Sequence, residues 1–170
     1  MKHLVLIGFM GTGKSTVGRR VARRLGRPFI DVDARIIERE GRSISDIFRE
    51  RGEAYFRDVE SAVIAEAAAQ DSAIIATGGG AVLRAQNVEC LKAHGLLVCL
   101  HADSASIAKR VGRRADRPLL AGEGDLRSRI EQLLAQRAPA YACADVTIET
   151  AGRSMDAIVN DVLRCAKRLA

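Results

Sequence analysis

One octapeptide near the start of the sequence constrains the fold more than any other feature. Gly8-Phe-Met-Gly-Thr-Gly-Lys-Ser15 fits the phosphate-binding pattern G-x-x-x-x-G-K-[S/T]. It follows the apolar run Leu4 to Ile7 and opens a predicted helix from Thr12 to Leu25, which is the strand–turn–helix setting that the motif requires. A plain Gly-rich turn is the alternative, and these neighbouring elements make it the weaker one. A chain built around this motif is expected to be an α/β protein.

The rest of the sequence alternates short apolar runs with helical patterns. These runs predict five strands, at Leu4 to Ile7, Phe29 to Val32, Ala73 to Ala76, Leu96 to Leu100 and Val146 to Ile148. Strands separated by helices form a parallel sheet that is covered on both faces. With 170 residues, we expect one domain, residues 1–170, with a three-layer α/β fold and a five-stranded parallel sheet flanked by helices.

The residue types of the octapeptide predict how it binds a nucleotide. Its glycines let successive backbone N–H groups converge on phosphate oxygens, and the positive end of the following helix adds its dipole. We expect Lys14 to bridge the β- and γ-phosphates of ATP and Ser15 to ligate Mg²⁺. The predicted nucleotide-binding residues here are Gly11, Thr12, Gly13, Lys14, Ser15 and Thr16.

Two carboxylates follow the second predicted strand. Asp31 and Asp33 are expected at its carboxyl end, on alternate faces, where doubly wound sheets place their ligands. Mg²⁺ prefers oxygen ligands, so Asp31 is the better candidate for the metal, beside Ser15. Asp33 is then able to orient an attacking hydroxyl and accept its proton. The residues alone equally allow both acids to cap a helix that starts near Ala34.

An arginine lies on the apolar stripe of the helix predicted after Gly124. Arg137 shares this stripe with Leu126, Ile130 and Leu133. A buried charge there is costly unless a carboxylate or phosphate pairs with it, and arginine is suited to bidentate pairing. Arg57 could contribute in the same way. The alternative is that both arginines lie at the surface or pair with protein acids such as Glu53 or Glu60.

A second glycine-rich turn, Gly78-Gly79-Gly80, follows the third predicted strand directly. It lies at the end of the sheet where ligands bind, and the lack of side chains would let backbone N–H groups reach a substrate. Its alternative is an ordinary turn that needs positive φ angles, but three consecutive glycines exceed what one turn requires.

Composition narrows the possible partners. The chain has 27 Lys and Arg against 21 Asp and Glu, a net charge of +6 that favours anionic ligands. The basic residues are dispersed and aromatic residues are scarce, which argues against nucleic-acid binding. No apolar run approaches the roughly 20 residues that span a bilayer. We therefore expect a cytoplasmic protein that binds no membrane, with reduced thiols at Cys90, Cys99, Cys143 and Cys165.

These motifs, in this order, resemble those of the shikimate kinase family, and the resemblance runs from Leu4 to Leu163. It extends to Arg117-Pro-Leu-Leu120 and Arg137-Ala-Pro-Ala-Tyr141. The resemblance implies a P-loop kinase fold with adenylate-kinase-like architecture and a mobile lid at about residues 112–124. It also implies ATP-dependent phosphorylation of the 3-hydroxyl of shikimate, giving shikimate 3-phosphate.

The same resemblance assigns roles to individual residues. It implies that Lys14, Asp33 and Arg117 are catalytic, with Arg117 reaching the γ-phosphate from the lid. Arg110 and Arg153 are expected beside the adenine. The implied substrate-binding residues are Asp33, Arg57, Gly79, Gly80 and Arg137, of which the two arginines grip the carboxylate. We expect a monomer that binds shikimate and ATP, with Mg²⁺.

Two other interpretations stay open at this point. One is another small P-loop kinase, such as a gluconate or nucleoside monophosphate kinase, which the spectrum of acceptors would distinguish. The other is a nucleotide-binding regulatory or nucleic-acid-binding module without transfer activity, which tight, salt-sensitive RNA or DNA binding would support.

Overall fold

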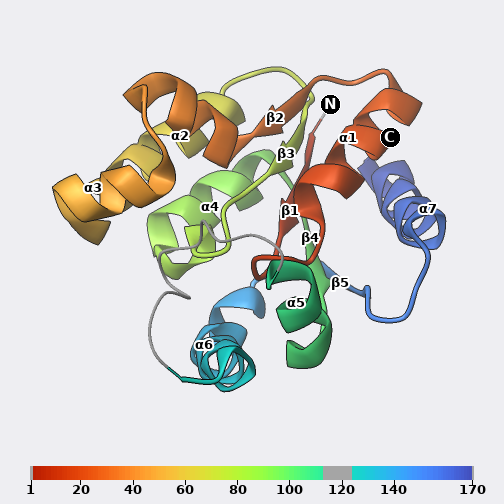
Figure 1. The fold of residues 1–170 in the computed structure, drawn as a ribbon. Coiled ribbons are helices and arrows are strands. Elements are labelled where there is room, and N and C mark those ends of the chain that lie inside the picture. The colour runs from red at the N-terminus through yellow and green to blue at the C-terminus, as the bar shows by residue number, and fades with distance from the viewer. Residues whose placement is uncertain (1, 113–123, 170) are drawn as a thin grey trace.

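The fold alternates strands and helices along the chain, as Figure 1 shows. The computed structural model describes residues 2–112 and 124–169. The strands are β1 (His3–Ile7), β2 (Phe29–Asp31), β3 (Ile74–Ala76), β4 (Gly95–His101) and β5 (Val146–Glu149). The helices are α1 (Lys14–Leu25), α2 (Val32–Glu40), α3 (Ile44–Ala68), α4 (Ala85–His94), α5 (Ser104–Val111), α6 (Leu126–Tyr141) and α7 (Met155–Ala166), with the 3₁₀ turns η1 (Ala81–Leu83) and η3 (Lys167–Leu169).

The five strands form one parallel sheet in the order β2-β3-β1-β4-β5. β1 is central, and the chain moves to one side of it for β2 and β3 and to the other for β4 and β5. The carboxyl ends of the strands therefore share one edge, and the crevice where the strand order reverses lies beside β1. Three segments follow strands at this edge, namely the two glycine-rich turns and the segment Asp31–Asp33.

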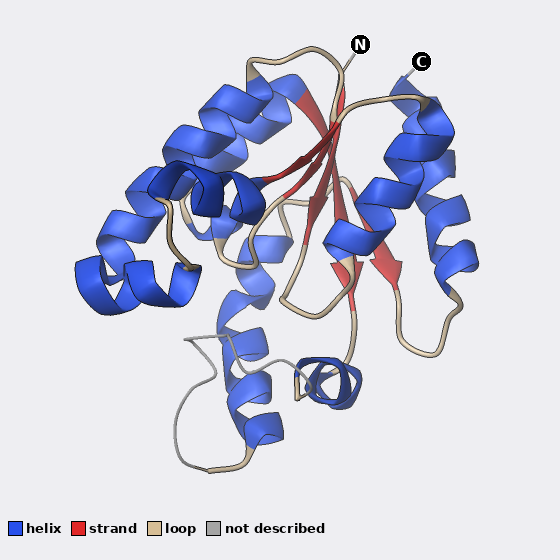
Figure 2. Ribbon diagram, turned by 45° about the horizontal axis from the view of Figure 1, so that its top comes forward, coloured by secondary structure: helices blue, strands red, loops and turns tan. Residues whose placement is uncertain are grey.

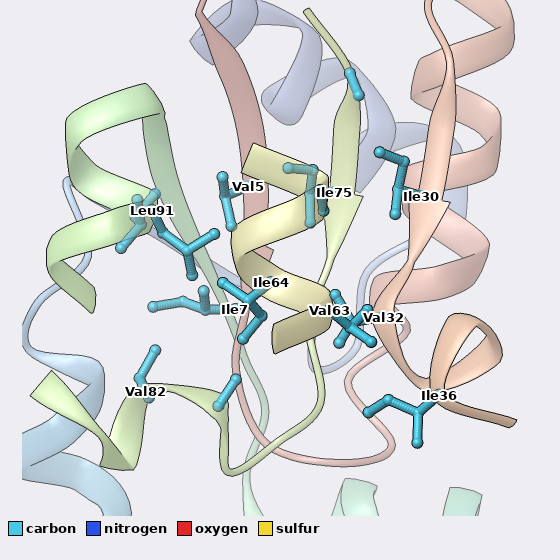
Figure 3. Close-up of a cluster of buried hydrophobic side chains, with 14 of the residues drawn as sticks. Val5, Ile7, Ile30, Val32, Ile36, Val63, Ile64, Ile75, Val82 and Leu91 are labelled. Carbon is cyan, nitrogen blue, oxygen red and sulfur yellow. The ribbon is translucent and has the colours of Figure 1, made fainter. Parts of the chain in front are cut away.

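Alternate residues of the strands face two separate cores, so helices cover both faces of the sheet (Figure 2). Leu4 and Leu6 pack with residues of α1 and α7, whereas Val5 and Ile7 pack with residues of α3 and α4. Figure 3 shows the second of these clusters, with Ile64 of α3 and Leu91 of α4 against the strand side chains. The predicted three-layer α/β fold is confirmed.

A third, smaller cluster lies beyond the carboxyl ends of the strands. Phe9 and Met10 of the glycine-rich loop pack there with Ile107 of α5 and Ile130 of α6. The loop is thus held from its outer side by two helices that come much later in the sequence. None of the helices in the described part of the chain is long and apolar enough to cross a membrane.

The structure differs from the sequence prediction at Asp33. β2 ends at Asp31 and α2 begins at Val32, so Asp33 lies in the first turn of a helix and not on the opposite face of a strand. The sequence also predicts a short helix that opens at Ser43 and a longer one from about Glu53 to Ala69, and α3 does consist of two helical parts that meet at Gly52, where φ is 84° and ψ is 169°. Only glycine adopts this conformation readily, so one residue bends the element between its two helical parts.

Candidate active site

The first glycine-rich loop curls at the start of α1 and forms a cradle. Gly11 and Gly13 have φ angles of 76° and 92°, and Gly13 is the N-cap of α1. The side chain of Lys14 is buried, and its Nζ donates hydrogen bonds of 2.8 Å to the carbonyl oxygens of Gly8 and Phe9. A buried ammonium is therefore held across the loop, beside the N–H groups at the positive end of a helix, which is a site suited to phosphate.

A hydroxyl and a carboxylate meet beside this cradle. The Ser15 Oγ donates a hydrogen bond of 2.6 Å to Asp31 Oδ2, while Asp31 Oδ1 accepts from the backbone N–H of Ala34 at 3.2 Å. Asp31 therefore caps α2, as the helix-cap alternative predicts, and still presents its other oxygen beside Ser15. No cluster of three or more His, Cys, Asp or Glu that could bind a metal occurs within residues 2–112 and 124–169. A single hydroxyl–carboxylate pair fits Mg²⁺, which keeps several waters and shares phosphate oxygens.

Two neighbouring cavities open at this edge of the sheet. The first, of about 250 Å³, is lined by the loop together with Thr77, Arg110 and Val111. The second, of about 400 Å³, lies over α2, α3 and the glycine turn after β3. We call them the nucleotide cavity and the acceptor cavity. Five residues line both of them: Met10, Ser15, Thr16, Asp33 and Gly79. The cavities therefore adjoin, with the carboxylate of Asp33 at the junction.

Arg57 enters the acceptor cavity from α3 with two acidic partners. Its guanidinium pairs with Glu60 at 2.8 Å and with Glu53 at 3.2 Å, and Glu60 is completely buried. Burial raises the pKa of the Glu60 carboxyl, and the charge of Arg57 opposes that rise. A methyl group on Gly80 would lie 2.4 Å from Arg57 Nη2, so the absence of a side chain there admits the guanidinium. The alternative prediction of pairing with Glu53 and Glu60 thus holds, while Arg57 also faces the cavity.

Arg137 lies opposite, on the inner face of α6. It is 5% exposed, and its Cζ stands 5.5 Å from the centroid of the Phe9 ring. Among the residues that the structure describes, Arg137 Nη1 has no hydrogen-bond partner, and neither has Glu60 Oε1. Buried polar atoms are normally paired, and an unpaired buried donor costs about 1–3 kcal/mol. Two such atoms in residues that line one cavity point to a ligand with acceptor and donor groups.

The remaining predicted residues lie in different surroundings. Arg110 lines the nucleotide cavity and donates hydrogen bonds to Gly11 O at 3.1 Å and Thr150 Oγ1 at 3.4 Å. Arg153 donates to Glu149 O and forms an ion pair of 2.6 Å with Asp161 of α7. The predicted lid at 112–124, including Arg117, lies almost entirely outside the described residues.

Sequence reasoning missed part of the acceptor cavity. Phe48 and Phe56 form one wall, with ring centroids 4.8 Å apart, and Met10 forms another. The sequence indicated Glu60 only as a partner for Arg57 or Arg137, and not as a residue of the cavity. The spacing Arg57-x-x-Glu60 could have indicated it, since residues three apart share a helix face. No local pattern marks Phe48, because the bend at Gly52 brings it to the cavity.

Comparison with known proteins agrees with this geometry. A family model described as shikimate kinase matches residues 10–167. A shikimate kinase from Pelotomaculum thermopropionicum is 43% identical, over 98% of this chain and 96% of that protein. A solved structure of shikimate kinase from Acinetobacter baumannii in complex with shikimate has a TM-score of 0.94 and 36% identity, over 99% of this chain and 94% of that one.

The gluconate kinase alternative receives less support. A gluconokinase structure from Sinorhizobium meliloti has a TM-score of 0.59 at 22% identity, and at that level only the fold is shared. The predicted enzyme class, a kinase that uses ATP and an alcohol acceptor, is confirmed by the relatives. With a family model that matches residues 10–167 and a relative that is 43% identical over 98% of this chain, this chain belongs to the shikimate kinase family.

Proposed function

We propose that this chain transfers the γ-phosphoryl group of MgATP to the 3-hydroxyl of shikimate, giving ADP and shikimate 3-phosphate. The observation that carries the proposal is the buried Nη1 of Arg137, which has no hydrogen-bond partner among the described residues and belongs to the acceptor cavity that Arg57 also lines. Two guanidinium groups in one pocket suit a carboxylate, and shikimate carries one together with hydroxyl groups. Glu60 Oε1 is a hydrogen-bond acceptor within the same cavity.

The two adjoining cavities suggest how the reacting groups meet. In this proposal the nucleotide cavity holds the phosphates against the loop N–H groups, and Lys14 neutralises charge on the transferred group. Asp33, at the junction, orients the attacking hydroxyl and accepts its proton. Positioning and charge stabilisation then supply most of the rate. Arg110 and Arg153 remain proposed adenine neighbours, and Arg117 remains a proposed contact of the γ-phosphate.

Ser15 and Asp31 would hold the magnesium ion. Bound Mg²⁺ would neutralise charge on the phosphate oxygens. Ser15 Oγ and Asp31 Oδ2 lie 2.6 Å apart, and Asp31 Oδ1 accepts the N-cap bond from Ala34, which would keep this carboxylate in place to hold the ion together with Ser15.

The proposal also covers the oligomeric state of the enzyme and its location in the cell. Both cavities are built from one chain, which supports an active monomer. All four cysteines are free, as expected of a cytoplasmic protein, where thiols stay reduced.

A coupled assay of ADP release tests the function. We expect turnover with MgATP and shikimate, and only background release with gluconate, with nucleoside monophosphates or without an acceptor. Turnover with another acceptor alone would contradict the assignment of shikimate but keep the kinase. Absence of turnover with every acceptor, in a protein that still binds ATP, would favour the binding-module interpretation instead.

A further inference from the structure

Tyr141 is the last residue of α6 and has no role in the reaction described so far. It lies behind the acceptor cavity, and its ring packs against both the core over α3 and α4 and the smaller cluster of α5 and α6. Its hydroxyl donates a hydrogen bond of 2.6 Å to the carbonyl oxygen of Gly79. This short bond joins α6 to the glycine turn after β3, 62 residues away in sequence.

Gly79 occupies a narrow space between the two halves of the site. A methyl group built on it would lie 3.2 Å from the backbone nitrogen of Met10 and 3.4 Å from Arg137 Nη1. The glycine turn is therefore enclosed by the phosphate-binding loop on one side and by the arginine on the other. A small displacement of Gly79 would alter the space available to a ligand that Arg137 contacts.

Arg137 and Tyr141 lie four residues apart on α6, so they share one face of the helix. Pro139 lies between them within the helix. The backbone after it forms a tight turn, in which the N–H of Ala142 donates a hydrogen bond of 3.3 Å to the carbonyl oxygen of Pro139. The same helix end thus presents a guanidinium to the acceptor cavity and a hydroxyl to the turn that forms its floor.

We infer that Tyr141 is a positioning residue for the acceptor: its hydroxyl holds the Gly79 carbonyl and so fixes the glycine turn relative to Arg137. The inference rests on the proposed function, because it concerns how that acceptor is bound. Tyr141 itself contacts neither the acceptor nor the nucleotide in this proposal. Tyr141 sets the geometry of the acceptor cavity before the acceptor binds. Its hydroxyl should therefore affect the affinity for the acceptor and leave the rate of the chemical step unchanged.

The hydroxyl remains a donor throughout the working pH range. Burial raises the pKa of Tyr141 to about 12, although the charge of Arg137 opposes this rise. The phenol is therefore protonated at neutral and mildly alkaline pH. Any effect of removing it should be the same at pH 6.5 and pH 9, unlike the effect of a residue that changes its protonation state in the reaction.

Tyr141→Phe tests the inference, because it removes the hydroxyl and keeps the packed ring. Tyr55→Phe is a matched control, since the chain has only two tyrosines and Tyr55 donates a similar bond of 2.9 Å to Glu40 Oε2. We expect Tyr141→Phe to raise KM and the calorimetric Kd for shikimate by about fivefold or more, as for a lost buried hydrogen bond. The value of kcat and KM for ATP should stay within about twofold. Tyr55→Phe should leave all four quantities unchanged.

The outcomes separate the inference from the proposed function. If the unchanged chain shows no shikimate-dependent turnover, the proposed function fails and the inference fails with it. If the unchanged chain is active but Tyr141→Phe binds shikimate as tightly, only the role of Tyr141 is overturned. A merely structural role of Tyr141 would lower Tm in Tyr141→Phe and change kcat and both KM values together, and that result would also overturn the inference.

Discussion

At the scale of the residue, Lys14 is held by the same loop that we propose binds phosphate. In this structure its Nζ donates to Gly8 O and Phe9 O, so the ammonium already lies across the loop. We predict that Lys14→Met lowers kcat by about 100-fold or more, because a charge aimed at the transferred group is lost. The fold should survive, because the apolar core does not include this residue, but Tm should fall because the carbonyl oxygens of Gly8 and Phe9 lose their buried donor.

The exposed Lys92 of α4 provides the control for Lys14. Lys92→Met removes an equal charge far along the chain from the loop, and it should leave kcat unchanged. Near-normal turnover in Lys14→Met, measured by ADP release, would contradict the assignment of this loop to phosphate binding.

Glu60 gives a prediction about pH. Its pKa is raised by burial above the ordinary 4.5, so the folded chain binds this proton more tightly than the unfolded chain does. Its contribution to stability is therefore complete below about pH 4.5 and declines as pH rises through the folded-state pKa. The glutamine of Glu60→Gln cannot ionise. The amount by which the Tm of the unchanged chain exceeds that of Glu60→Gln should therefore shrink between pH 4.5 and pH 8.

Thermal unfolding of both proteins at several pH values tests the direction of this change in the Tm difference. Burial has the largest effect on the pKa of the Glu60 carboxyl and raises it. The charges of Arg57 and Arg137 lower this pKa and the charge of Asp33 raises it, but the pKa is raised overall. The exposed Glu89→Gln serves as the matched loss of one carboxylate. A difference in Tm between the unchanged chain and Glu60→Gln that grows with pH would show that the ion pair with Arg57 dominates instead.

At the scale of the element, most boundaries could be predicted, including the break between the two helical parts of α3. The strands and the loop were predicted because each carries its own local pattern, such as Leu4 to Ile7 before the glycines. Arg137 was predicted from helical spacing, since burial of the stripe places it inward. The packing of Phe48 against Phe56 across the bend at Gly52 could not be predicted, because it depends on tertiary structure that no short pattern encodes.

Gly52 allows a test of that bend. Its φ of 84° and ψ of 169° belong to a region essentially restricted to glycine, and an added methyl group would meet no atom within 4 Å. Gly52→Ala should therefore cost about 1–3 kcal/mol from backbone strain alone. It should also raise KM for shikimate, because the wall formed by Phe48 and Phe56 depends on the bend.

Gly41 is the matched control for Gly52. It also has open space around it and a positive φ of 65°, but it adopts the left-handed conformation that asparagine also takes at helix ends, whereas the conformation of Gly52 is essentially restricted to glycine. Gly41→Ala should lower Tm less than Gly52→Ala and leave KM for shikimate unchanged. Equal losses of stability in the two variants would mean that a side chain at position 52 causes no more backbone strain than one at an ordinary helix end.

At the scale of the whole molecule, the two ends of the parallel sheet have different tasks. The carboxyl ends of the strands lead into the loop, the carboxylates and the glycine turn. The amino ends are joined to neighbouring segments by hydrogen bonds such as those of His3. His3, at the start of β1, is buried and accepts a hydrogen bond of 2.9 Å from the N–H of Ala73 through Nδ1, while Nε2 lies 3.1 Å from Ala68 O.

This separation predicts that stability and catalysis can be changed independently. His3→Ala leaves the N–H of Ala73 and the carbonyl of Ala68 without their buried partner, at a cost of about 1–3 kcal/mol. For a chain of this length, Tm should fall by roughly 2–4 °C for each kcal/mol. Because β1 separates His3 from the loop, kcat and both KM values, measured well below Tm, should stay within about twofold. A change of more than about tenfold in either KM would mean that the amino ends of the strands control the geometry of the site, and that the sheet does not divide its tasks between its two edges.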